Sequence, residues 1–358
     1  MKRKCKNIDI TDIEFIKSCI QKCMSNKRKS RWDITRLKRK YGNFDNLAAA
    51  MQREIINKRL DVKEIWYSEK VDPSNHKVRR IGIQDIKQQI YDYIAVEGLG
   101  EILRRIGTYQ CASIKGKGQL YGIRAVSRWV KDGSIRYAAK LDIRRCYESI
   151  DRQKLMDFLR RHVKNDTLLW LIERLIGSFE QGLAIGSYLS QYLCNLYLSE
   201  LYHEISERMY KTRRGKRLNL VKHTCFYMDD ILLLGTSASD IAKAIKLIIQ
   251  KAGEMGLSIK PDWRVFKLSD NQFVDIMGAK IYRDHITIRK YVFKRIRQAF
   301  MRTRRQMTAK LASKCCSYWG SLKHTDSFKF RKKYKVRQIL NKARRVISHE
   351  SKIRCAAA

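Results

Sequence analysis

The chain has 358 residues, of which 77 are Lys or Arg and 35 are Asp or Glu, so its formal net charge is +42. A positive field of that size implies a polyanionic partner, with nucleic acid as the first candidate and a membrane surface as the second. No apolar run approaches the roughly 18 residues that a spanning helix needs, and no apolar segment follows the basic start. We therefore expect neither a membrane span nor a secretory signal.

The cysteine and proline content indicates how the chain is organised. Ten cysteines are scattered without a CxxC pair, which argues against a zinc ribbon and favours reduced thiols in a cytoplasmic protein. Only two prolines occur, Pro73 and Pro261, and no Gly/Ser-rich linker is visible. These features predict one continuous molecule of several lobes.

The N-terminal part is predicted to be basic and helical. Within residues 9–70, apolar residues recur at a spacing of three to four. The sequence of residues 72–75, Asp-Pro-Ser-Asn, breaks this pattern. Residues 76–83 follow as a short strand that is dense in cations, and residues 84–106 return to a helical period.

The middle of the chain begins with an apolar segment that ends in an acid. Residues 137–143 are predicted to form a buried strand with Asp142 at its end. Helices are expected at about 151–176, followed by a glycine-bearing loop at 181–186. A long apolar helix is predicted from 187 to about 210.

Two adjacent carboxylates, Asp229 and Asp230, then interrupt two apolar, β-prone runs within residues 221–235. Ionised carboxylates are seldom placed between core strands unless something neutralises them. Mg²⁺ is one such neutraliser, because it takes oxygen ligands from one or two carboxylates and from substrate phosphates. The segment is therefore interpreted as a β-hairpin whose tip presents a metal site; the alternative is an ordinary hairpin with a solvated Asp-Asp turn.

The rest of the chain is predicted to be an amphipathic helix at 239–255, two or three strands between 263 and 290, and a basic helical end. From residue 289 onward we count 22 Lys or Arg residues against two acids, Asp326 and Glu350. The whole pattern favours an α+β layout in which helices pack on one face of an antiparallel sheet.

If the strand that ends in Asp142 pairs beside the Asp-Asp hairpin, Asp142 and Asp229 converge. Two convergent carboxylates hold two Mg²⁺ ions roughly 3.5–4 Å apart in enzymes of phosphoryl transfer. One ion would activate a 3′-hydroxyl, and the other would hold a triphosphate.

The motifs at this point resemble those of reverse transcriptases. Residues 141–150 (Leu-Asp-Ile-Arg-Arg-Cys-Tyr-Glu-Ser-Ile) are similar to the first palm motif, and residues 226–230 (Phe-Tyr-Met-Asp-Asp) are similar to the Tyr-x-Asp-Asp motif. Five such segments occur in the right order between about residues 76 and 300. The resemblance implies a right-hand polymerase with fingers, a ferredoxin-like palm of antiparallel sheet backed by helices, and a helical thumb. The implied divisions are a basic helical N-terminal extension at 1–70, fingers at 71–135, a palm at 136–285 with a helical insertion at 150–180, and a basic helical thumb at 286–358.

The resemblance also assigns roles to residues. It implies that Asp142, Asp229 and Asp230 are catalytic. It also implies that these acids and Ile143 bind two Mg²⁺ ions, for which Mn²⁺ is an alternative. The incoming dNTP is assigned to Lys77, Arg79, Arg80, Tyr147, Ile185, Gly186 and Gln191. Template and primer are assigned to Gly116, Lys117, Gly118, Met277, Gly278, Tyr318 and Trp319. Lys260 lies near the fourth palm motif, but the match is loose and we assign no general acid there.

Some of these residues have simpler interpretations. The fingers cations suit bidentate pairing with phosphate, or they form a solvated basic face. Tyr147 corresponds to the aromatic residue that lies under the sugar and excludes a 2′-hydroxyl, or it is a core aromatic. Tyr318 and Trp319 suit stacking on bases, or they belong to the core of the thumb.

The loop before the long helix narrows the subclass. Its pattern, Ile185-Gly186-x-x-x-Ser190-Gln191, is typical of diversity-generating retroelement enzymes, which misread template adenines. Met228 departs from the Ala or Val common in that group, so an antiphage-defence enzyme remains the alternative. Such an enzyme would copy a partner non-coding RNA or make repetitive or template-independent DNA. A third hypothesis is a non-catalytic nucleic-acid binder.

The resemblance implies several partners. These are a structured template or non-coding RNA, a DNA or RNA primer, dNTPs, and either a small basic accessory protein or further copies of the chain. The enzyme would be bacterial or phage-encoded.

Overall fold

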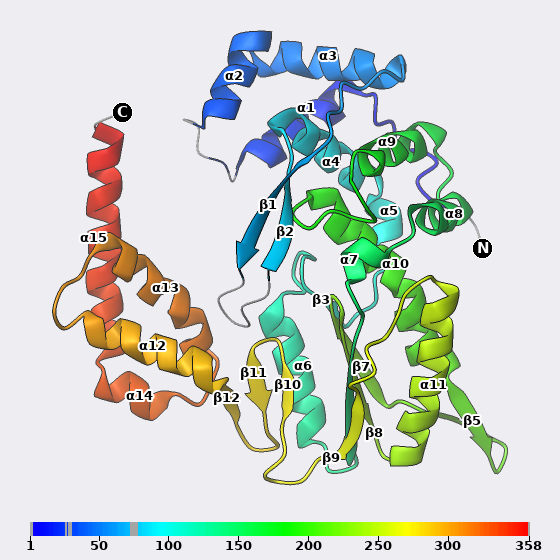
Figure 1. The fold of residues 1–358 in the computed structure, drawn as a ribbon, viewed down its shortest axis with the longest axis vertical. Helices are drawn as coiled ribbons and strands as arrows, with labels where there is room; N and C mark the ends of the chain where they lie inside the picture. Colours follow the sequence, from blue (N-terminus) through cyan, green and yellow to red (C-terminus); the bar gives the residue numbers. More distant parts are fainter. Residues whose placement is uncertain (1–2, 26, 28–30, 72–77, 357–358) are drawn as a thin grey trace.

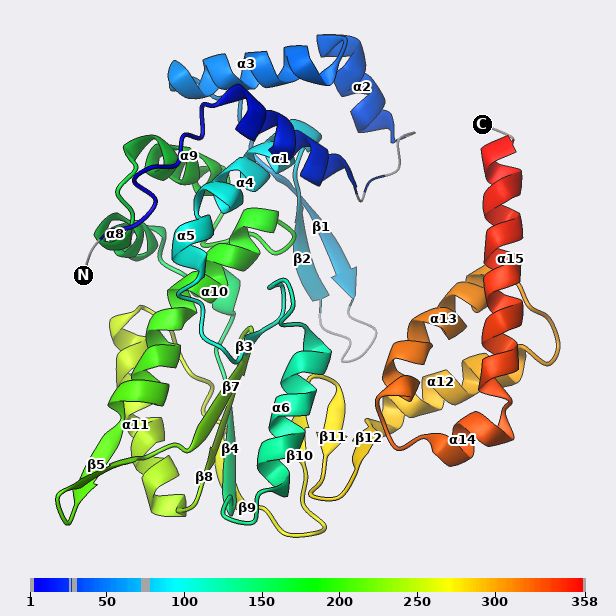
Figure 2. The ribbon, with the colours of Figure 1, turned by 180° about the vertical axis from the view of Figure 1, so that it is seen from behind.

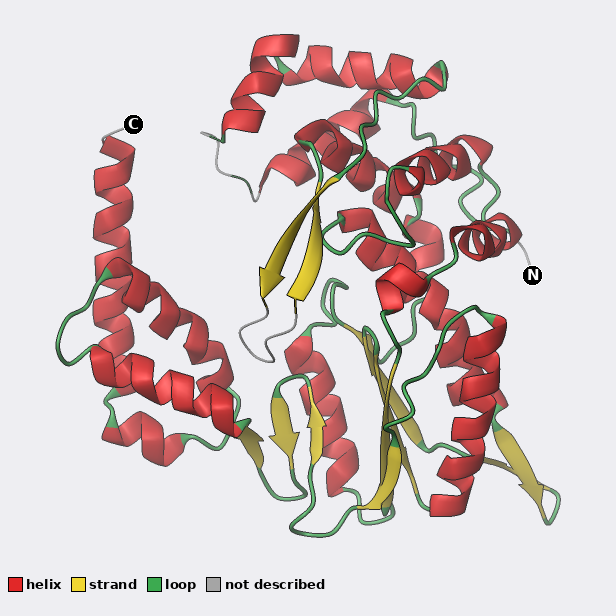
Figure 3. Cartoon of the chain, in the orientation of Figure 1, coloured by secondary structure: helices red, strands yellow, loops and turns green. Residues whose placement is uncertain are grey.

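The computed structural model describes residues 3–25, 27, 31–71 and 78–356. Helices and small sheets alternate through this part of the chain, so the α+β class is confirmed (Figures 1 and 3). Within the described ranges, no helix is both long enough and apolar enough to cross a lipid bilayer.

The N-terminal part packs helices around one buried helix. The helices are α1 (Ile13–Ser25), α2 (Trp32–Tyr41), α3 (Phe44–Ile56), α4 (Ile86–Gly98) and the short α5 (Gly100–Leu103). Ile16 and Ile20 of α1 are fully buried, as the apolar spacing predicts. Helix α4 lies at the centre and contacts α1 on one side and helices further along the chain on the other.

The helical expectation is wrong for residues 66–70. They belong to strand β1 (Trp66–Val71), which pairs antiparallel with β2 (Val78–Ile83). The pairing is complete over six residue pairs, so cross-strand hydrogen bonds outweigh the local helical period. The part of the expected cation-dense strand at 76–77 lies outside the described residues.

A five-stranded sheet forms the middle of the molecule, in the order β3-β7-β8-β4-β9. Its strands are β3 (Gln110–Cys111), β7 (His223–Tyr227), β8 (Asp230–Gly235), β4 (Tyr137–Asp142) and β9 (Arg264–Lys267). Neighbours run antiparallel except β3 and β7, which are parallel. The predicted pairing of the two acid-bearing segments is confirmed, because the register places Asp142 directly opposite Asp230.

Both faces of this sheet are covered, whereas the sequence analysis expected helices on one face. Ile231 and Leu233 of β8 face a large core with α10 (Tyr188–His203) and α11 (Ala238–Glu254). Leu232 and Leu234 face a smaller core with α6 (Gln119–Lys131). The reason is visible in β8, whose central residues are apolar on both sides, the pattern of a strand buried on both faces.

The helices expected at 151–176 are present as α8 (Arg152–His162) and α9 (Asp166–Gly177). Each begins at a side-chain cap: Asp151 accepts hydrogen bonds from the first turn of α8, and Asn165 accepts one from α9. Helix α9 packs against α4, which joins this segment to the N-terminal helices.

The long helix expected from 187 to about 210 is shorter than predicted. Helix α10 ends at His203 and passes through a π-helical turn, Glu204–Arg208, into a hairpin. This hairpin consists of β5 (Tyr210–Arg213) and β6 (Lys216–Asn219), and most of its side chains are exposed. In Figures 1 and 2 it projects from the side of the central sheet that is farthest from the C-terminal helices.

The C-terminal part is a separate helical unit. A three-stranded sheet of β10 (Val274–Ile276), β11 (Ala279–Ile281) and β12 (Ile286–Ile288) leads into it. The helices are α12 (Lys290–Arg302), α13 (Ala309–Lys323), α14 (Phe328–Lys333) and α15 (Val336–Ala356). Phe300, Leu322 and Leu340 are buried in a core of its own, to which no described residue of the central sheet belongs.

Candidate active site

The Asp-Asp hairpin has the shortest turn that an antiparallel pair allows. Tyr227 pairs with Asp230, so Met228 and Asp229 form a two-residue loop. Met228 adopts a left-handed conformation, with φ of 56°, which a non-glycine residue seldom does. Its sulfur lies 3.3 Å from Nδ2 of Asn195 on α10. The tight loop places Asp229 at the tip.

Asp142 meets this tip from the neighbouring strand. It is the last residue of β4, and the following backbone amide, that of Ile143, donates a hydrogen bond to the carbonyl of Asp229 at 3.1 Å. The three acids therefore lie at one end of the same sheet, held there by backbone pairing and independent of any side-chain rotamer.

The closeness of these acids shifts the pKa of Asp229. Burial, followed by repulsion from Asp230 and Asp142, raises the pKa of Asp229. Two lysines reach the other acids: Nζ of Lys140 lies 3.0 Å from Asp230, and Lys260 forms an ion pair with Asp142. Three carboxylates thus face two ammonium groups, and the negative charge of Asp229 is left for a further cation to balance.

Lys260 is the residue that sequence reasoning did not assign. Its backbone amide donates to the carbonyl of Asp142 at 2.9 Å, and Ile259 bridges Ile143, so the segment after α11 runs alongside the end of β4. A lysine shortly before strand β9 was the available signal. It could not be interpreted, because the contact joins residues more than a hundred positions apart.

The carboxylate oxygens at this end of the sheet suit a hard divalent cation. Oδ1 of Asp142 is buried and receives no hydrogen bond, its charge being met by the ammonium of Lys260. Among the described residues, no three His, Cys, Asp or Glu side chains converge as a ready-made metal site. Asp142 and Asp229 instead suit an ion that takes one or two carboxylates and completes its shell with substrate phosphates and water, as Mg²⁺ does.

Tyr147 lies just beyond β4, in the single-turn helix α7 (Cys146–Ser149). Its carbonyl accepts a hydrogen bond of 2.8 Å from the amide of Leu183, and its ring packs against the large core. A Cβ on Gly182 would lie 2.4 Å from the carbonyl oxygen of Glu148, so only glycine permits this approach. The glycine-bearing loop is thereby held against the turn that carries Tyr147.

The same loop also touches strand β2. The amide of Gly82 donates to the carbonyl of Ile185 at 2.7 Å, and Gly186, with φ of 110°, lies so close that a Cβ would be 2.6 Å from the Gly82 carbonyl oxygen. The structure therefore brings Ile185 and Gly186 next to the cation-bearing strand. Gln191 follows on α10, where its carbonyl accepts a hydrogen bond from Asn195.

The cations of β2 differ in their surroundings. Arg80 forms a bidentate pair with Glu180, with contacts of 2.8 and 3.2 Å, and its guanidinium lies over the ring of Tyr67. Arg79 is exposed. Lys77, the third residue assigned to the triphosphate, lies outside the described residues.

A buried acid that the sequence analysis overlooked anchors the start of α10. Asp92 on α4 is fully buried and accepts hydrogen bonds from the hydroxyl of Ser187 at 2.7 Å, the amide of Leu189 at 3.2 Å and the side chain of Gln84 at 3.2 Å. Burial raises its pKa to about 6, and these hydrogen bonds oppose the rise. Through its bonds to Ser187 and Leu189, Asp92 thus holds the end of the loop that contains Ile185.

The residues assigned to template and primer form two groups. Gly118 precedes α6, and Met277 and Gly278 form the turn between β10 and β11, both with positive φ. The side chain of Gln119 donates to the carbonyl of Met277, so these two segments lie side by side. Lys117 donates to the carbonyl of Gly107 at 3.0 Å, and Gly116 adopts a φ of 79°.

The second group lies in the C-terminal helices. Tyr318 and Trp319 on α13 are half-buried and pack against the core of that unit. A structural role for part of each ring is therefore established, and their remaining exposed surface is what stays available to nucleic acid.

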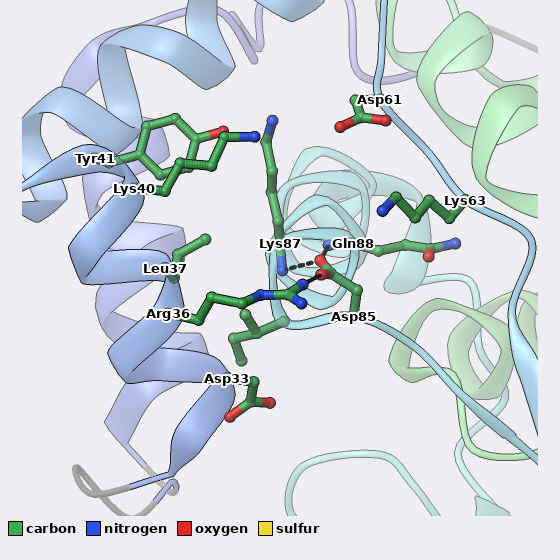
Figure 4. Close-up of a pocket in the computed structure, with 11 residues that line it drawn as sticks. Asp33, Arg36, Leu37, Lys40, Tyr41, Asp61, Lys63, Asp85, Lys87 and Gln88 are labelled. Carbon is green, nitrogen blue, oxygen red and sulfur yellow. Dashed lines mark hydrogen bonds and ion pairs between the residues drawn. The ribbon is translucent and has the colours of Figure 1, made fainter.

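A cavity of about 90 Å³ lies away from the acids, between α2 and the start of α4 (Figure 4). Two ion pairs involve residues that line it: Arg36 with Asp85 at 3.4 Å, and Lys87 with Glu54 at 2.5 Å. These two pairs join α2 and α3 to the start of α4.

A sheet that ends in crowded acids, beside a tyrosine and a glycine-bearing loop, is the arrangement of a nucleic-acid polymerase. The family model for "Reverse transcriptase (RNA-dependent DNA polymerase)" matches residues 69–321. The chain belongs to this family and is an RNA-directed DNA polymerase, a nucleotidyltransferase that binds an RNA template, a primer and dNTPs. The family has a palm, fingers and thumb, and its members generally use divalent metal ions. No match was found among curated proteins.

Proposed function

We propose that the chain extends a 3′-hydroxyl with dNTPs by two-Mg²⁺ nucleotidyl transfer, and that it does so with reduced fidelity at template adenines, as diversity-generating enzymes do. The observation that carries the first part is the register of β4 on β8, with Asp142 opposite Asp230 and Asp229 at the adjoining tip. When bound, the ions would activate the attacking hydroxyl and hold the triphosphate. The chain itself supplies the three carboxylates from backbone positions that strand pairing fixes.

Chelation of divalent ions tests the metal requirement. We expect primer extension on an RNA template to stop in EDTA and to return with excess Mg²⁺ or Mn²⁺, because several kcal/mol of barrier reduction comes from such ions. Gel analysis of a labelled primer measures this result. Zn²⁺ in equal excess is the control, since its preference for nitrogen and sulfur ligands makes it a poor match to an all-oxygen site. Extension that persists in EDTA would contradict the proposal.

The fidelity part is supported by Ile185. Its carbonyl is fixed by Gly82, while its side chain cannot donate or accept a hydrogen bond beside the nascent pair. A glutamine at this position would restore one such bond, with a net contribution of about 0.5–1.5 kcal/mol. Misincorporation opposite adenine is then limited by fewer contacts than in enzymes that have glutamine.

Replacing Ile185 tests this interpretation. We expect Ile185→Gln to lower misincorporation opposite template adenine by roughly 2- to 10-fold, because one hydrogen bond of that strength is restored. Sequencing of the DNA products from a fixed RNA template measures it. Ile185→Val is the matched control and should leave the error spectrum unchanged. Equal adenine errors in all three proteins would remove the role given to Ile185.

An antiphage-defence enzyme is the second candidate, favoured by Met228. In the structure Met228 holds a left-handed turn and contacts Asn195, so it shapes the loop that presents Asp229. Homopolymeric or short-repeat DNA in the same sequencing experiment would support this candidate. A faithful copy with errors confined to adenines would support the diversity-generating one. In either case a partner RNA and a cytoplasmic location stay predictions.

A further inference from the structure

The hairpin of β5 and β6 carries a dense positive charge that the polymerase site does not use. Residues 210–217 include Lys211, Arg213, Arg214, Lys216 and Arg217, and no acid occurs from 209 to 221. Most side chains of both strands are exposed, so the hairpin adds little to any core. A two-stranded ribbon is at best marginally stable alone, so a contribution to the stability of the fold does not explain why this hairpin is present.

The cations of the hairpin divide into two kinds. Lys211 pairs with Asp240 at 2.6 Å, and Arg217 donates to the carbonyl of Glu207 at 2.7 Å and covers the ring of Tyr210. These contacts attach the hairpin to α11 and to the turn after α10. Within the part of the chain that the structure describes, the side chains of Arg213, Arg214 and Lys216 at the tip make no ion pair or hydrogen bond, so their charge is available to a partner.

The turn itself is built at a conformational cost. Arg214 and Gly215 join the strands with φ of 50° and 71°, the two-residue turn for which Asn-Gly is the favoured sequence. An arginine in the left-handed region costs roughly 1 kcal/mol more than a residue suited to it. An arginine at the most protruding point, where asparagine would fit better, indicates that the charge is needed there.

The hairpin lies apart from the three active-site carboxylates, where primer and template would bind. It projects on the side of the central sheet away from the C-terminal helices (Figures 1 and 2). RNA is the polyanion that every enzyme of this family must hold as template before synthesis starts. Binding of single strands combines cations with several exposed aromatic rings. The hairpin has one aromatic residue, Tyr210, which is 45% exposed and has Arg217 stacked over its ring. Duplex RNA is instead recognised through phosphates and shape.

We propose that the tip of the β5–β6 hairpin is a second RNA-binding site, which holds a double-helical stem of the enzyme's RNA outside the polymerase cleft through Arg213, Arg214 and Lys216. This site depends on the use of RNA by the family and not on the two-ion chemistry proposed above. Binding at the hairpin and primer extension at the acids are therefore measured separately.

Charge removal on the tip is the first test. The probe is an RNA stem-loop of about 20 base pairs, which is longer than the span of common duplex-binding domains. It is titrated against protein whose polymerase cleft is already filled with excess short primer-template. We expect Arg213→Gln with Lys216→Gln to weaken binding on the order of tenfold and to lower the slope of log affinity against log salt by about 2. Lys243→Gln with Lys246→Gln, on the exposed face of α11, removes equal charge and is the control. Equal affinity in the two double variants would overturn the proposal, and a protein partner would then account for the charge.

A single substitution separates binding from folding. Arg214→Asn removes one tip charge and supplies the residue that the turn prefers, so we expect the melting temperature to stay equal or rise while affinity for the RNA stem falls about fivefold. A purely structural role of Arg214 would move stability and affinity together. Extension of a short unstructured primer-template should be unchanged in all these variants, and a parallel loss of extension would overturn the separation of the two sites.

Discussion

Asp229→Asn is expected to abolish primer extension on an RNA template, by about 10³-fold or more, while leaving the fold intact. The substitution keeps the shape of the side chain and removes the carboxylate at the tip of the hairpin. Loss of the several kcal/mol that a divalent ion contributes to phosphoryl transfer accounts for the size of the effect. Steady-state extension with a labelled primer measures it, and binding of primer-template should be unaffected.

Stability moves in the opposite direction in the same variant. The pKa of Asp229 is raised by burial and by two neighbouring acids, so its ionised form opposes folding at pH values above that pKa. The ion-free Asp229→Asn protein should therefore melt at the same or a higher temperature than the parent at neutral pH. Added Mg²⁺ should stabilise the parent and not the variant. Asp270→Asn, at an exposed position, is the matched control and should behave as the parent in both assays. Extension at the parental rate would refute the assignment of Asp229.

Tyr147→Ala is expected to admit ribonucleotides. The carbonyl of Tyr147 is tied to Leu183 and its ring is half-buried, so the ring occupies one fixed position beside the acids. If that ring excludes a 2′-hydroxyl, its removal should raise the relative use of rNTPs over dNTPs by roughly 10- to 200-fold, the range typical of one steric group. The ratio of kcat/KM values for the two substrates measures this, and it is independent of how much protein is folded.

Tyr147→Phe distinguishes the ring from the hydroxyl. Because exclusion depends on the bulk of the ring, phenylalanine should keep the parental preference for dNTPs. A large gain of ribonucleotide use with phenylalanine would show that the hydroxyl contributes. Unchanged selectivity with alanine would leave Tyr147 as an ordinary core aromatic.

Local pattern predicted the parts of the site that depend on neighbouring residues. The hairpin follows from two apolar runs interrupted by Asp229 and Asp230, although its two-residue turn is Met228-Asp229 and Asp230 belongs to β8. The pairing of the strand that ends in Asp142 with this hairpin follows from acids at the ends of buried strands. Lys260 and Asp92 could not be found this way. Their contacts join distant segments, and a lone lysine or a lone acid in an apolar helix carries no periodic signal.

The strands that the sequence analysis missed share one cause. Strands β1, β5 and β6 are largely exposed on both faces, so they lack the alternation of apolar and polar residues on which strand prediction depends. The covering of both faces of the central sheet was missed for the opposite reason. A strand that is apolar throughout, such as β8, does not reveal which helix will lie on which side.

The separate core of the C-terminal helices has a consequence for local stability. Phe300, Leu322 and Leu340 are buried among residues of the C-terminal helices and not among those of the central sheet. Two hydrogen bonds tie this unit to β12, from the amide of Asp326 to the carbonyl of Ile286 at 2.8 Å and from the amide of Ile286 to the carboxylate of Asp326 at 2.7 Å. A substitution that loosens this core should therefore increase local opening of the C-terminal helices and leave the central sheet unaffected.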